Sequence, residues 1–299
     1  MKLEMIFGST SDKGKVMPGI EEFSKAHPEV EVYVHWASAD NTPEKVADIM
    51  GALVGVDKAV DERDFGPHAF ISGAGKSNVL TGVVKQYATL TDIVIGIPIT
   101  DSITAGWSSA SSTSEKPPMN PVLTVPLNGT YAAANIAYRF LDTPPADIVI
   151  FDHPDMSSTA ELAKVMEKYG IEYRLNRDCK DVSDEVVITP FASCTPQFTM
   201  DTIWSIDNRL TRGSGIQVAF MGGKEMCKDH YLGVFQYDTK STCFTTQGDY
   251  LNAVIAAAQL TQNHDALSRI QEDRDKKADA LKKEPMTMVL AGHVTERNY

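Results

Sequence analysis

The chain has 299 residues, of which 42% are hydrophobic and 23% charged, and its formal net charge at pH 7 is -12. This composition is typical of a globular protein with one large domain or two of moderate size. It argues against a nucleic-acid-binding protein, because the only basic runs, Lys276-Lys277 and Lys282-Lys283, lie among acidic residues. An anionic small molecule could still be bound by local backbone dipoles.

The first residues and the cysteines favour a cytoplasmic protein without a membrane partner. Residues 1–7 are too short and too acidic for a signal peptide, and no apolar run is long enough to span a membrane. Four cysteines lie in the second half without a Cys-x-x-Cys pair, and they are Cys179, Cys194, Cys227 and Cys243. They favour buried free thiols in a reducing compartment, with metal ligation a poor second.

Apolar runs alternate with helix-like segments through the first half. Strands are expected at 3–7, 30–36, 69–72, 92–99 and 121–125, and helices at 13–26, 43–54, 79–87 and 129–141. The segment 107–120, rich in Ser and Pro, is expected to be a loop or a broken helix. Strands that alternate with helices predict an α/β protein with a parallel sheet covered on both faces.

A second cycle follows a linker at 142–145. Strands are expected at 147–151, 171–176, 185–190, 216–221 and 241–245, and helices at 157–169, 249–260 and 263–284. The order matches the first half, so we infer an internal duplication with one domain at 1–143 and a degenerate copy at 144–299. The charged last helix is either a solvated surface segment or an arm that packs on a neighbouring subunit.

Three small, polar loops follow the first three expected strands, at 8–12, 38–41 and 73–78. Ligands of parallel sheets bind beyond the carboxyl ends of the strands, so these loops should converge on one edge. Glycines in the first and third loops would let a ligand approach the backbone, and a helix N-terminus favours an anion.

The first loop carries hydroxyl groups on Ser9, Thr10 and Ser11 beside a helix start. Such hydroxyls suit a phosphate. The Asp12 carboxylate could accept hydrogen bonds from ribose hydroxyls, as carboxylates do in nucleotide sites. Serine and aspartate at these positions could instead simply cap the helix.

The other two loops carry candidate catalytic groups. Asp40 could serve as a general acid or base, or cap the next helix. Lys76 could bind an anion or stabilise developing carboxylate charge, or be a surface lysine. Ser77 and Asn78 could orient a small polar group, or cap the helix after them. Trp107-Ser108-Ser109 could cover the site as a lid, or simply pack.

Two further patterns favour weaker hypotheses. Gly75-Lys76-Ser77 matches the end of a P-loop, but the full motif requires a glycine where Phe70 stands, which argues against a P-loop NTPase. His153 and Asp155 could form a catalytic pair in the first turn of the second copy. That turn lacks the serines of the first copy, which favours a copy that has lost its site.

The loop sequences together carry a family pattern. It comprises residues 7–14 (Phe-Gly-Ser-Thr-Ser-Asp-Lys-Gly), Ser38-Ala39 with Thr42-Pro43 close behind, and residues 73–82 (Gly-Ala-Gly-Lys-Ser-Asn-Val-Leu-Thr-Gly). These segments resemble the aminoimidazole ribonucleotide (AIR) carboxylase family of purine synthesis, PurE. The Ala-Gly-Lys-Ser-Asn form resembles the class II branch, which carries Ala-Gly-Arg-Ser-Asn and uses carbon dioxide directly. The class I branch, a mutase, has a Gly-Gly-Ala-Ala-His type of loop.

The resemblance implies a three-layer, flavodoxin-like fold that needs no cofactor and no metal. Single domains of the family form an octamer, which four copies of a tandem chain would reproduce as a homo-oligomer. The implied substrates are a small-molecule ribonucleotide and carbon dioxide. The implied catalytic residues are Asp40, Lys76 and Ser77. The implied substrate-binding residues are Gly8, Ser9, Thr10, Ser11, Asp12, Ser38, Ala39, Gly75 and Asn78.

The second loop departs from the family. Asp40 stands where the family has the histidine of a Ser-Ala-His pattern, and Asn41 replaces the basic residue after it. Residues 110–114 replace an expected Leu-Arg-Met-Pro segment. A histidine can shuttle a proton near neutral pH, whereas an aspartate needs a raised pKa to do so. Either the chemistry is changed, or the second copy completes the site, or the chain is a relative that does something else.

The sequence thus predicts an enzyme that carboxylates AIR to carboxyaminoimidazole ribonucleotide, with carbon dioxide used directly. The alternative is a non-catalytic or altered-specificity nucleotide-binding paralogue of the family, which the exchanges at Asp40 and Asn41 favour.

Overall fold

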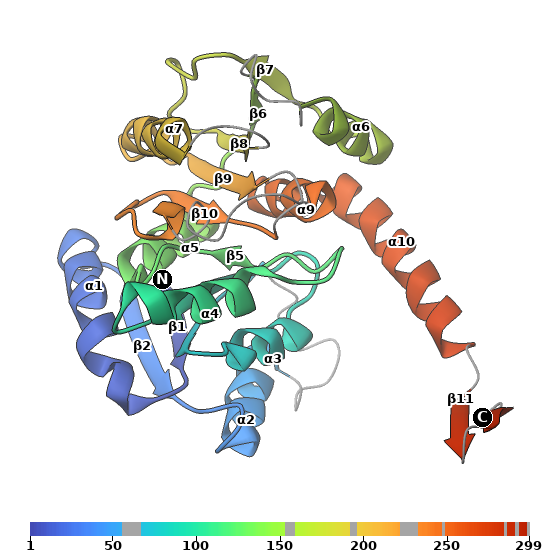
Figure 1. Cartoon of the computed structure of the whole chain (residues 1–299). Helices are drawn as coiled ribbons and strands as arrows, with labels where there is room; N and C mark the ends of the chain where they lie inside the picture. The colour runs from blue at the N-terminus through green and yellow to red at the C-terminus, as the bar shows by residue number, and fades with distance from the viewer. Residues whose placement is uncertain are drawn as a thin grey trace.

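The computed structural model describes residues 1–55, 67–152, 159–191, 196–221, 233–246, 249–283, 286–290 and 293–297. Most of them build one large sheet with helices packed against it, and a long charged helix leads away to the C-terminal residues (Figure 1). No helix in these ranges is long and apolar enough to cross a membrane.

The first half supplies five strands of the large sheet and the helices between them. The strands are β1 (Lys2–Phe7), β2 (Glu31–Trp36), β3 (Ala69–Gly75), β4 (Ile93–Ile99) and β5 (Leu123–Thr124). The helices are η1 (Thr10–Asp12), a single 3-10 turn, and α1 (Lys13–Ala26), α2 (Pro43–Val54), α3 (Val79–Tyr87), α4 (Ile103–Ser114) and α5 (Thr130–Asp142).

The second half supplies the other five strands of the same sheet. They are β6 (Ile148–Phe151), β7 (Arg174–Asn176), β8 (Val186–Phe191), β9 (Ile216–Met221) and β10 (Thr242–Phe244). Its described helices are α6 (Thr159–Tyr169), α7 (Pro196–Leu210), α9 (Tyr250–Leu260) and α10 (His264–Lys282). After α10, β11 (Met286–Leu290) and β12 (His293–Arg297) pair as a separate antiparallel hairpin.

Both halves place their strands in the same order. The ten-stranded sheet runs β2-β1-β3-β4-β5-β10-β9-β8-β6-β7, so each half has the order 2-1-3-4-5 when its own strands are numbered in sequence. That is the flavodoxin-like, doubly wound order. The repeated order agrees with the predicted internal duplication, whereas a domain boundary at residues 143 and 144 stays a prediction.

The halves meet at a seam where β5 and β10 pair antiparallel, with Phe244 opposite Thr124. All other neighbouring strands of the large sheet are parallel. At the seam, therefore, the carboxyl ends of the two sets of strands point to opposite edges of the sheet.

Alternate residues of β1 face opposite layers, as the period of a strand requires. Met5 and Phe7 pack in one hydrophobic cluster with α1 and α5, whereas Ile6 packs in another with α2 and α3. In β4, every residue of Ile-Val-Ile-Gly-Ile-Pro-Ile is buried, which a central parallel strand with two covered faces demands. The first half is thus a three-layer α/β unit.

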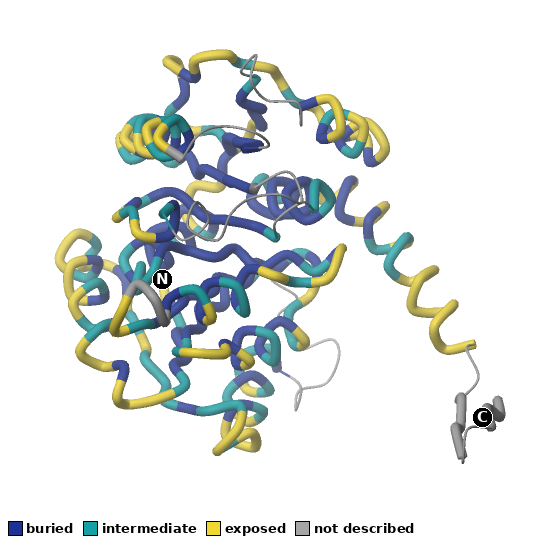
Figure 2. The backbone as a smooth tube through the Cα atoms, in the orientation of Figure 1, coloured by how far each residue is buried: buried dark blue, intermediate teal, exposed yellow. Residues whose placement is uncertain are grey.

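Helices α5 and α9 lie in the deepest part of the molecule (Figure 2). Their residues belong to one hydrophobic cluster that draws on both halves. Arg139 of α5 is buried at the same place and donates hydrogen bonds to Leu210 O (3.1 Å), Gly215 O and Ser241 Oγ (2.8 Å). A single buried guanidinium therefore ties the first half to the second.

The sequence predicted the order along the chain of the strands and of most helices correctly, and four segments differ. The strand expected at 69–72 continues through Gly75, so the glycines of the third loop lie in β3. The loop or broken helix expected at 107–120 is helical as far as Ser114. Helix α7 and the two strands of the β11–β12 hairpin were not expected at all.

Helix α4 forms despite its many serines and threonines because their hydroxyls find backbone partners. Thr113 Oγ1 donates to Ser109 O (2.6 Å) and Ser114 Oγ to Ala110 O (2.9 Å) within the helix. Ser109 Oγ donates to Ala74 O of β3 (3.0 Å). Tertiary hydrogen bonding thus overrides a composition that alone favours loops.

Candidate ligand site at the strand ends

The strands of the first half end in register. Phe7 lies opposite Trp36 on β2 and Gly73 on β3, and Gly75 lies opposite Ile99 on β4. The loops after these four strands consequently open at the same edge of the sheet. The sequence predicted this convergence for three of the loops.

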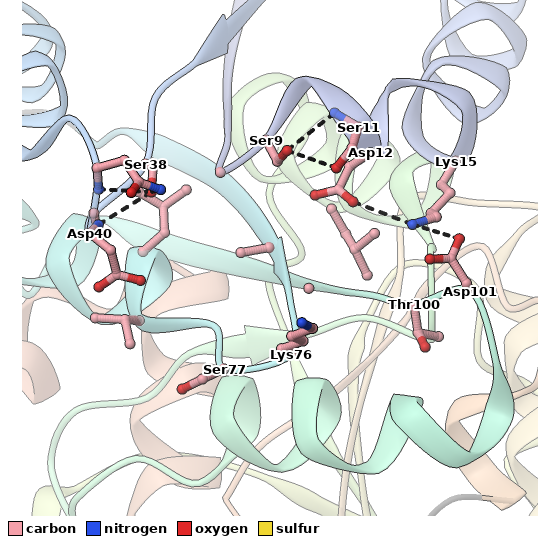
Figure 3. A pocket seen from close by; sticks show the side chains of 18 residues that line it. Ser9, Ser11, Asp12, Lys15, Ser38, Asp40, Lys76, Ser77, Thr100 and Asp101 are labelled. Carbon is pink, nitrogen blue, oxygen red and sulfur yellow. Dashed lines mark hydrogen bonds and ion pairs between the residues drawn. The ribbon is translucent and has the colours of Figure 1, made fainter.

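These loops line a pocket of about 520 Å³ (Figure 3). Its lining consists of Gly8, Ser9, Ser11, Asp12, Lys15, Ser38, Ala39, Asp40, Asn41, Ala74, Gly75, Lys76, Ser77, Val79, Leu80, Ile99, Thr100 and Asp101. Within the described ranges, the second half contributes nothing to this lining. We call it the strand-end pocket.

The first loop presents a compact set of donors. Ser9 caps the η1 turn, with its Oγ accepting from the Ser11 amide at 3.2 Å, and the two hydroxyl oxygens lie 2.7 Å apart. Gly8 is needed here, because a Cβ on it would approach Ala74 Cβ to 3.2 Å. The absence of a side chain lets the first and third loops lie close together, and the Gly8 amide donates to Gly73 O at 3.0 Å.

Lys15, in the first turn of α1, adds a cation that was not predicted from the sequence. Its Nζ lies 2.8 Å from Asp101 Oδ1 and 3.4 Å from Asp12 Oδ1. The hydrogen bond with Asp101, assisted by Asp12, raises the pKa of Lys15. The Asp101 side chain is 84% exposed, so this ion pair is readily exchanged for a ligand anion.

The fourth loop, Thr100 and Asp101, was also missed. Its signal was present, because these residues follow β4 directly, at the same edge as the other three loops. Asn128 fixes the loop by accepting from the Thr100 amide and donating to Thr100 O, both at 3.0 Å.

The second loop is organised by Ser38. Its Oγ accepts hydrogen bonds from the Asp40 amide (3.3 Å) and from the Asn41 amide and side chain (both 3.2 Å). The turn leaves the Asp40 side chain exposed on the pocket wall (Figure 3). Asp40 is therefore placed where it can reach a ligand, although α2 begins soon after it.

The third loop turns sharply between β3 and α3. Lys76 has φ 51°, a left-handed conformation that a non-glycine residue adopts only where its surroundings enforce it. Ser112 of α4 supports the turn by donating its Oγ to Lys76 O at 3.4 Å. Lys76 and Ser77 both line the pocket, as predicted.

Asn78 and Thr10, which the sequence assigned to ligand binding, do not line the strand-end pocket. Asn78 is buried and caps α3, with its Oδ1 accepting from the Thr81 amide at 3.2 Å. Its Nδ2 donates to Thr113 Oγ1 at 2.9 Å. The capping alternative describes Asn78 better, because its amide is occupied inside the fold.

The structure argues against two of the alternatives that the sequence left open, the P-loop and the lid at Trp107. The glycines of the suspected P-loop belong to β3, which leaves no long phosphate-cradling loop before α3. Trp107 packs beside the second half's hydrophobic cluster, as a core residue does. His153 and Asp155 lie outside the described residues.

Two of the four cysteines, Cys179 and Cys243, are buried free thiols, and burial raises the pKa of Cys179 to about 12. Cys194 and Cys227 lie outside the described residues. Where the chain is described, no three His, Cys, Asp or Glu side chains gather as a metal site requires.

A doubly wound α/β unit with a polar pocket at its strand ends defines a small-ligand-binding protein of the flavodoxin-like class. The family model described as AIR carboxylase matches residues 2–149. The N5-carboxyaminoimidazole ribonucleotide mutase of Pyrococcus abyssi (strain GE5 / Orsay) is 34% identical over 143 residues, which cover 47% of this chain and 73% of that protein. The chain therefore belongs to the AIR carboxylase family.

Among solved structures, the chain is similar to the crystal structure of Treponema denticola PurE, with 24% identity and a TM-score of 0.35. The match covers 47% of this chain and 82% of that one. The order of the strands by itself defines the flavodoxin-like fold.

Proposed function

We propose that the chain catalyses carboxylation of AIR to carboxyaminoimidazole ribonucleotide in purine biosynthesis, with carbon dioxide as the direct carboxyl donor. The observation that carries the proposal is that the three family loops meet in one pocket, with Asp40 and Lys76 both on its wall. Family membership supplies the reaction class, and the Ala-Gly-Lys-Ser-Asn loop supports the class II form.

The first loop is assigned to the ribose phosphate. Hydroxyls of Ser9 and Ser11 lie beside the start of η1 and α1, where the helix dipole favours an anion. Lys15 reaches the same pocket and can exchange Asp101 for a phosphate oxygen. Asp12 is the acceptor for ribose hydroxyls.

The second and third loops are assigned to the reacting base. Carboxylation joins a ring carbon of the aminoimidazole to carbon dioxide, and that carbon must then lose its proton. Asp40 is the proton acceptor in this scheme and the donor in the reverse direction. Lys76 and Ser77 stabilise the carboxylate as its charge develops.

A non-catalytic or altered-specificity paralogue is the second candidate. It is favoured by the exchange of the family histidine for Asp40 and of its basic neighbour for Asn41. The Pyrococcus relative is named a mutase, so N5-carboxyaminoimidazole ribonucleotide is the substrate to compare with carbon dioxide. A homo-oligomer of four chains remains part of the proposal as an expectation from the family.

The test is a spectrophotometric assay of carboxyaminoimidazole ribonucleotide decarboxylation, run beside a calorimetric titration with the same ligand. Asp40→Ala should lower kcat/KM by about 10²- to 10⁴-fold, the usual contribution of a general acid or base, while binding persists. Asp48→Ala removes an exposed carboxylate from α2 and should change neither quantity.

Binding by the wild-type chain without turnover would select the paralogue, and Asp40→His would then be the variant to assay for rescue. Neither binding nor turnover would refute the carboxylase and the non-catalytic binder of the same ribonucleotide, and the substrate would then have to be sought elsewhere. Activity with N5-carboxyaminoimidazole ribonucleotide but not with carbon dioxide would replace the class II assignment by the mutase reaction.

A further inference from the structure

A second cavity lies between α3, the segment after α4, and α10. Its volume is about 420 Å³. Its lining consists of Gly82, Lys85, Gln86, Ala88, Lys116, Pro117, Asn120 and Arg274. None of these residues lines the strand-end pocket, and nothing in the proposed carboxylation uses them. We call it the cationic cavity, because three of the lining side chains are basic and none is acidic.

Lys85 is the unusual member of this set. The residue is only 9% exposed, and its Nζ is buried without a hydrogen-bond partner among the described residues. A buried ammonium group without a partner destabilises the fold, because its lost hydration is not replaced by protein contacts. Burial and the nearby charge of Arg274 lower the pKa of Lys85 to about 8, although the charge of Asp92 acts in the opposite direction. The group therefore remains mostly cationic at pH 7.

The acid whose charge acts on Lys85, Asp92, does not pair with it. Both oxygens of Asp92 accept hydrogen bonds elsewhere: Oδ1 from the His68 amide at 2.9 Å, and Oδ2 from the Thr89 amide and hydroxyl at 2.6 and 2.7 Å. The charge of Asp92 therefore acts on Lys85 from a distance, and the two side chains do not form an ion pair.

The other two cations converge on the same space. Lys116 Nζ donates to Ser112 O at 2.7 Å and lies 3.9 Å from where a Cβ on Gly82 would stand. Arg274 of α10 donates one Nη2 hydrogen bond to Asn120 Oδ1 at 3.2 Å. Burial lowers the pKa of both side chains. Such a shift is expected where nearby negative charge does not offset the cost of burying a cation.

We propose that the cationic cavity is a binding site for a phosphate group, either free or carried by a small metabolite. A phosphate offers enough oxygens to accept from Lys85, Lys116 and the Arg274 guanidinium together. The amides of Gln86 and Asn120 border the same space and can bind neutral parts of a larger ligand. The volume accommodates more than the phosphate alone.

A shallower hollow along α3 connects the two sites. It shares Ser77 and Val79 with the strand-end pocket, and Gly82, Gln86 and Lys116 with the cationic cavity. Both sites thus border the same helix, from its N-terminal and its C-terminal turns. The cationic cavity is nevertheless a separate site, because Lys85 and Arg274 lie at that cavity alone.

Inorganic phosphate is the probe, titrated calorimetrically into the wild-type chain and its variants at constant ionic strength. Lys85→Met keeps the length of the side chain and removes its charge, so it should eliminate one class of sites or weaken it about tenfold, the loss expected for a charge-assisted hydrogen bond. Lys25→Met, which removes an exposed charge from α1, is the matched control and should bind as the wild type does.

The strand-end pocket is also expected to hold phosphate, so its contribution must be separated. Ser11→Val alters only the strand-end pocket. The Ser11→Val chain should therefore keep the phosphate site of the cationic cavity, which Lys85→Met removes. Thermal unfolding in phosphate-free buffer gives a second readout, because removing an unpaired buried charge should raise the midpoint of Lys85→Met above that of the wild type.

Should Lys85→Met not fold, Arg274→Gln on the half-buried side of the cavity takes its place in the titration. Phosphate binding that is the same in wild type and in the cavity variant would overturn the proposal. So would a wild-type chain that binds no phosphate. Loss of binding in Ser11→Val but not in Lys85→Met would assign all phosphate to the strand-end pocket, and the cationic cavity would be rejected.

Discussion

The two halves of the sheet share a strand order but differ at their strand ends. In the first half, serines, three aspartates and two lysines line the strand-end pocket. In the second half, the described pocket near the ends of β6 and β7 is smaller, about 260 Å³, and includes Phe151, Phe198, Arg177 and Arg209. A common scaffold thus carries two chemically different surfaces, which shows why function must be argued from a site and not from a fold.

The largest expected effect is on kcat/KM, and it is tested by removing one basic side chain from each of the two pockets. Lys76→Met should lower kcat/KM for carboxyaminoimidazole ribonucleotide decarboxylation by about 10²- to 10³-fold, because it removes a group that stabilises the carboxylate in the transition state. Arg177→Met makes a comparable change beside the second-half pocket and should leave kcat/KM within about twofold. Steady-state kinetics on both variants decides whether the surfaces differ in function, and equal losses would mean that the second half serves the reaction too.

A smaller effect tests whether the halves are one cooperative unit. Arg139→Met leaves the acceptors at Leu210, Gly215 and Ser241 without their buried donor. The free energy of unfolding should fall by about 3 kcal/mol, measured by urea denaturation. Arg212→Met, an exposed arginine nearby, should cost less than about 0.5 kcal/mol. Two separate transitions in the wild type would contradict the single unit.

The smallest expected effect concerns a buried aspartate in each half. Burial alone would raise the pKa of Asp92, but hydrogen bonds from His68 and Thr89 outweigh it and lower that pKa below its usual value. Burial raises the pKa of Asp207, despite hydrogen bonds from residues 240 and 241. The two carboxylates should therefore contribute opposite slopes to the pH dependence of stability.

For Asp92, the depressed pKa adds stability above the pKa of the unfolded chain, and this stability is lost as the pH falls through the folded pKa. For Asp207, the raised pKa means that stability is lost as the pH rises from the unfolded to the folded value. Asp92→Asn should cost about 2 kcal/mol at pH 7 and flatten the acid limb of the stability profile, whereas Asp207→Asn should steepen it. Denaturation curves at a series of acidic pH values measure both, and slopes of equal sign would contradict the assignment.

The sequence predicted the sheet and three of the four site loops because local patterns encode them. Pro43 near the start of α2 and the continuous apolar run of β4 need no tertiary information. The pairing of Lys15 with Asp101 could not be predicted, since it depends on the register of β1 and β4 through β3. Likewise, local sequence left open whether Asn78 binds a ligand or caps α3, and the contact with Thr113 of α4 that occupies its side-chain amide is tertiary.

The antiparallel seam between β5 and β10 has a consequence for how the chain can vary. Strand for strand, the molecule has the arrangement of an isologous dimer whose two subunits are covalently fused. In a true homodimer each substitution occurs twice, at symmetry-related positions, so a change harmful at one loop cannot be confined to it. Here each substitution occurs once, which leaves one half free to keep a polar binding loop while its counterpart drifts toward a purely structural role.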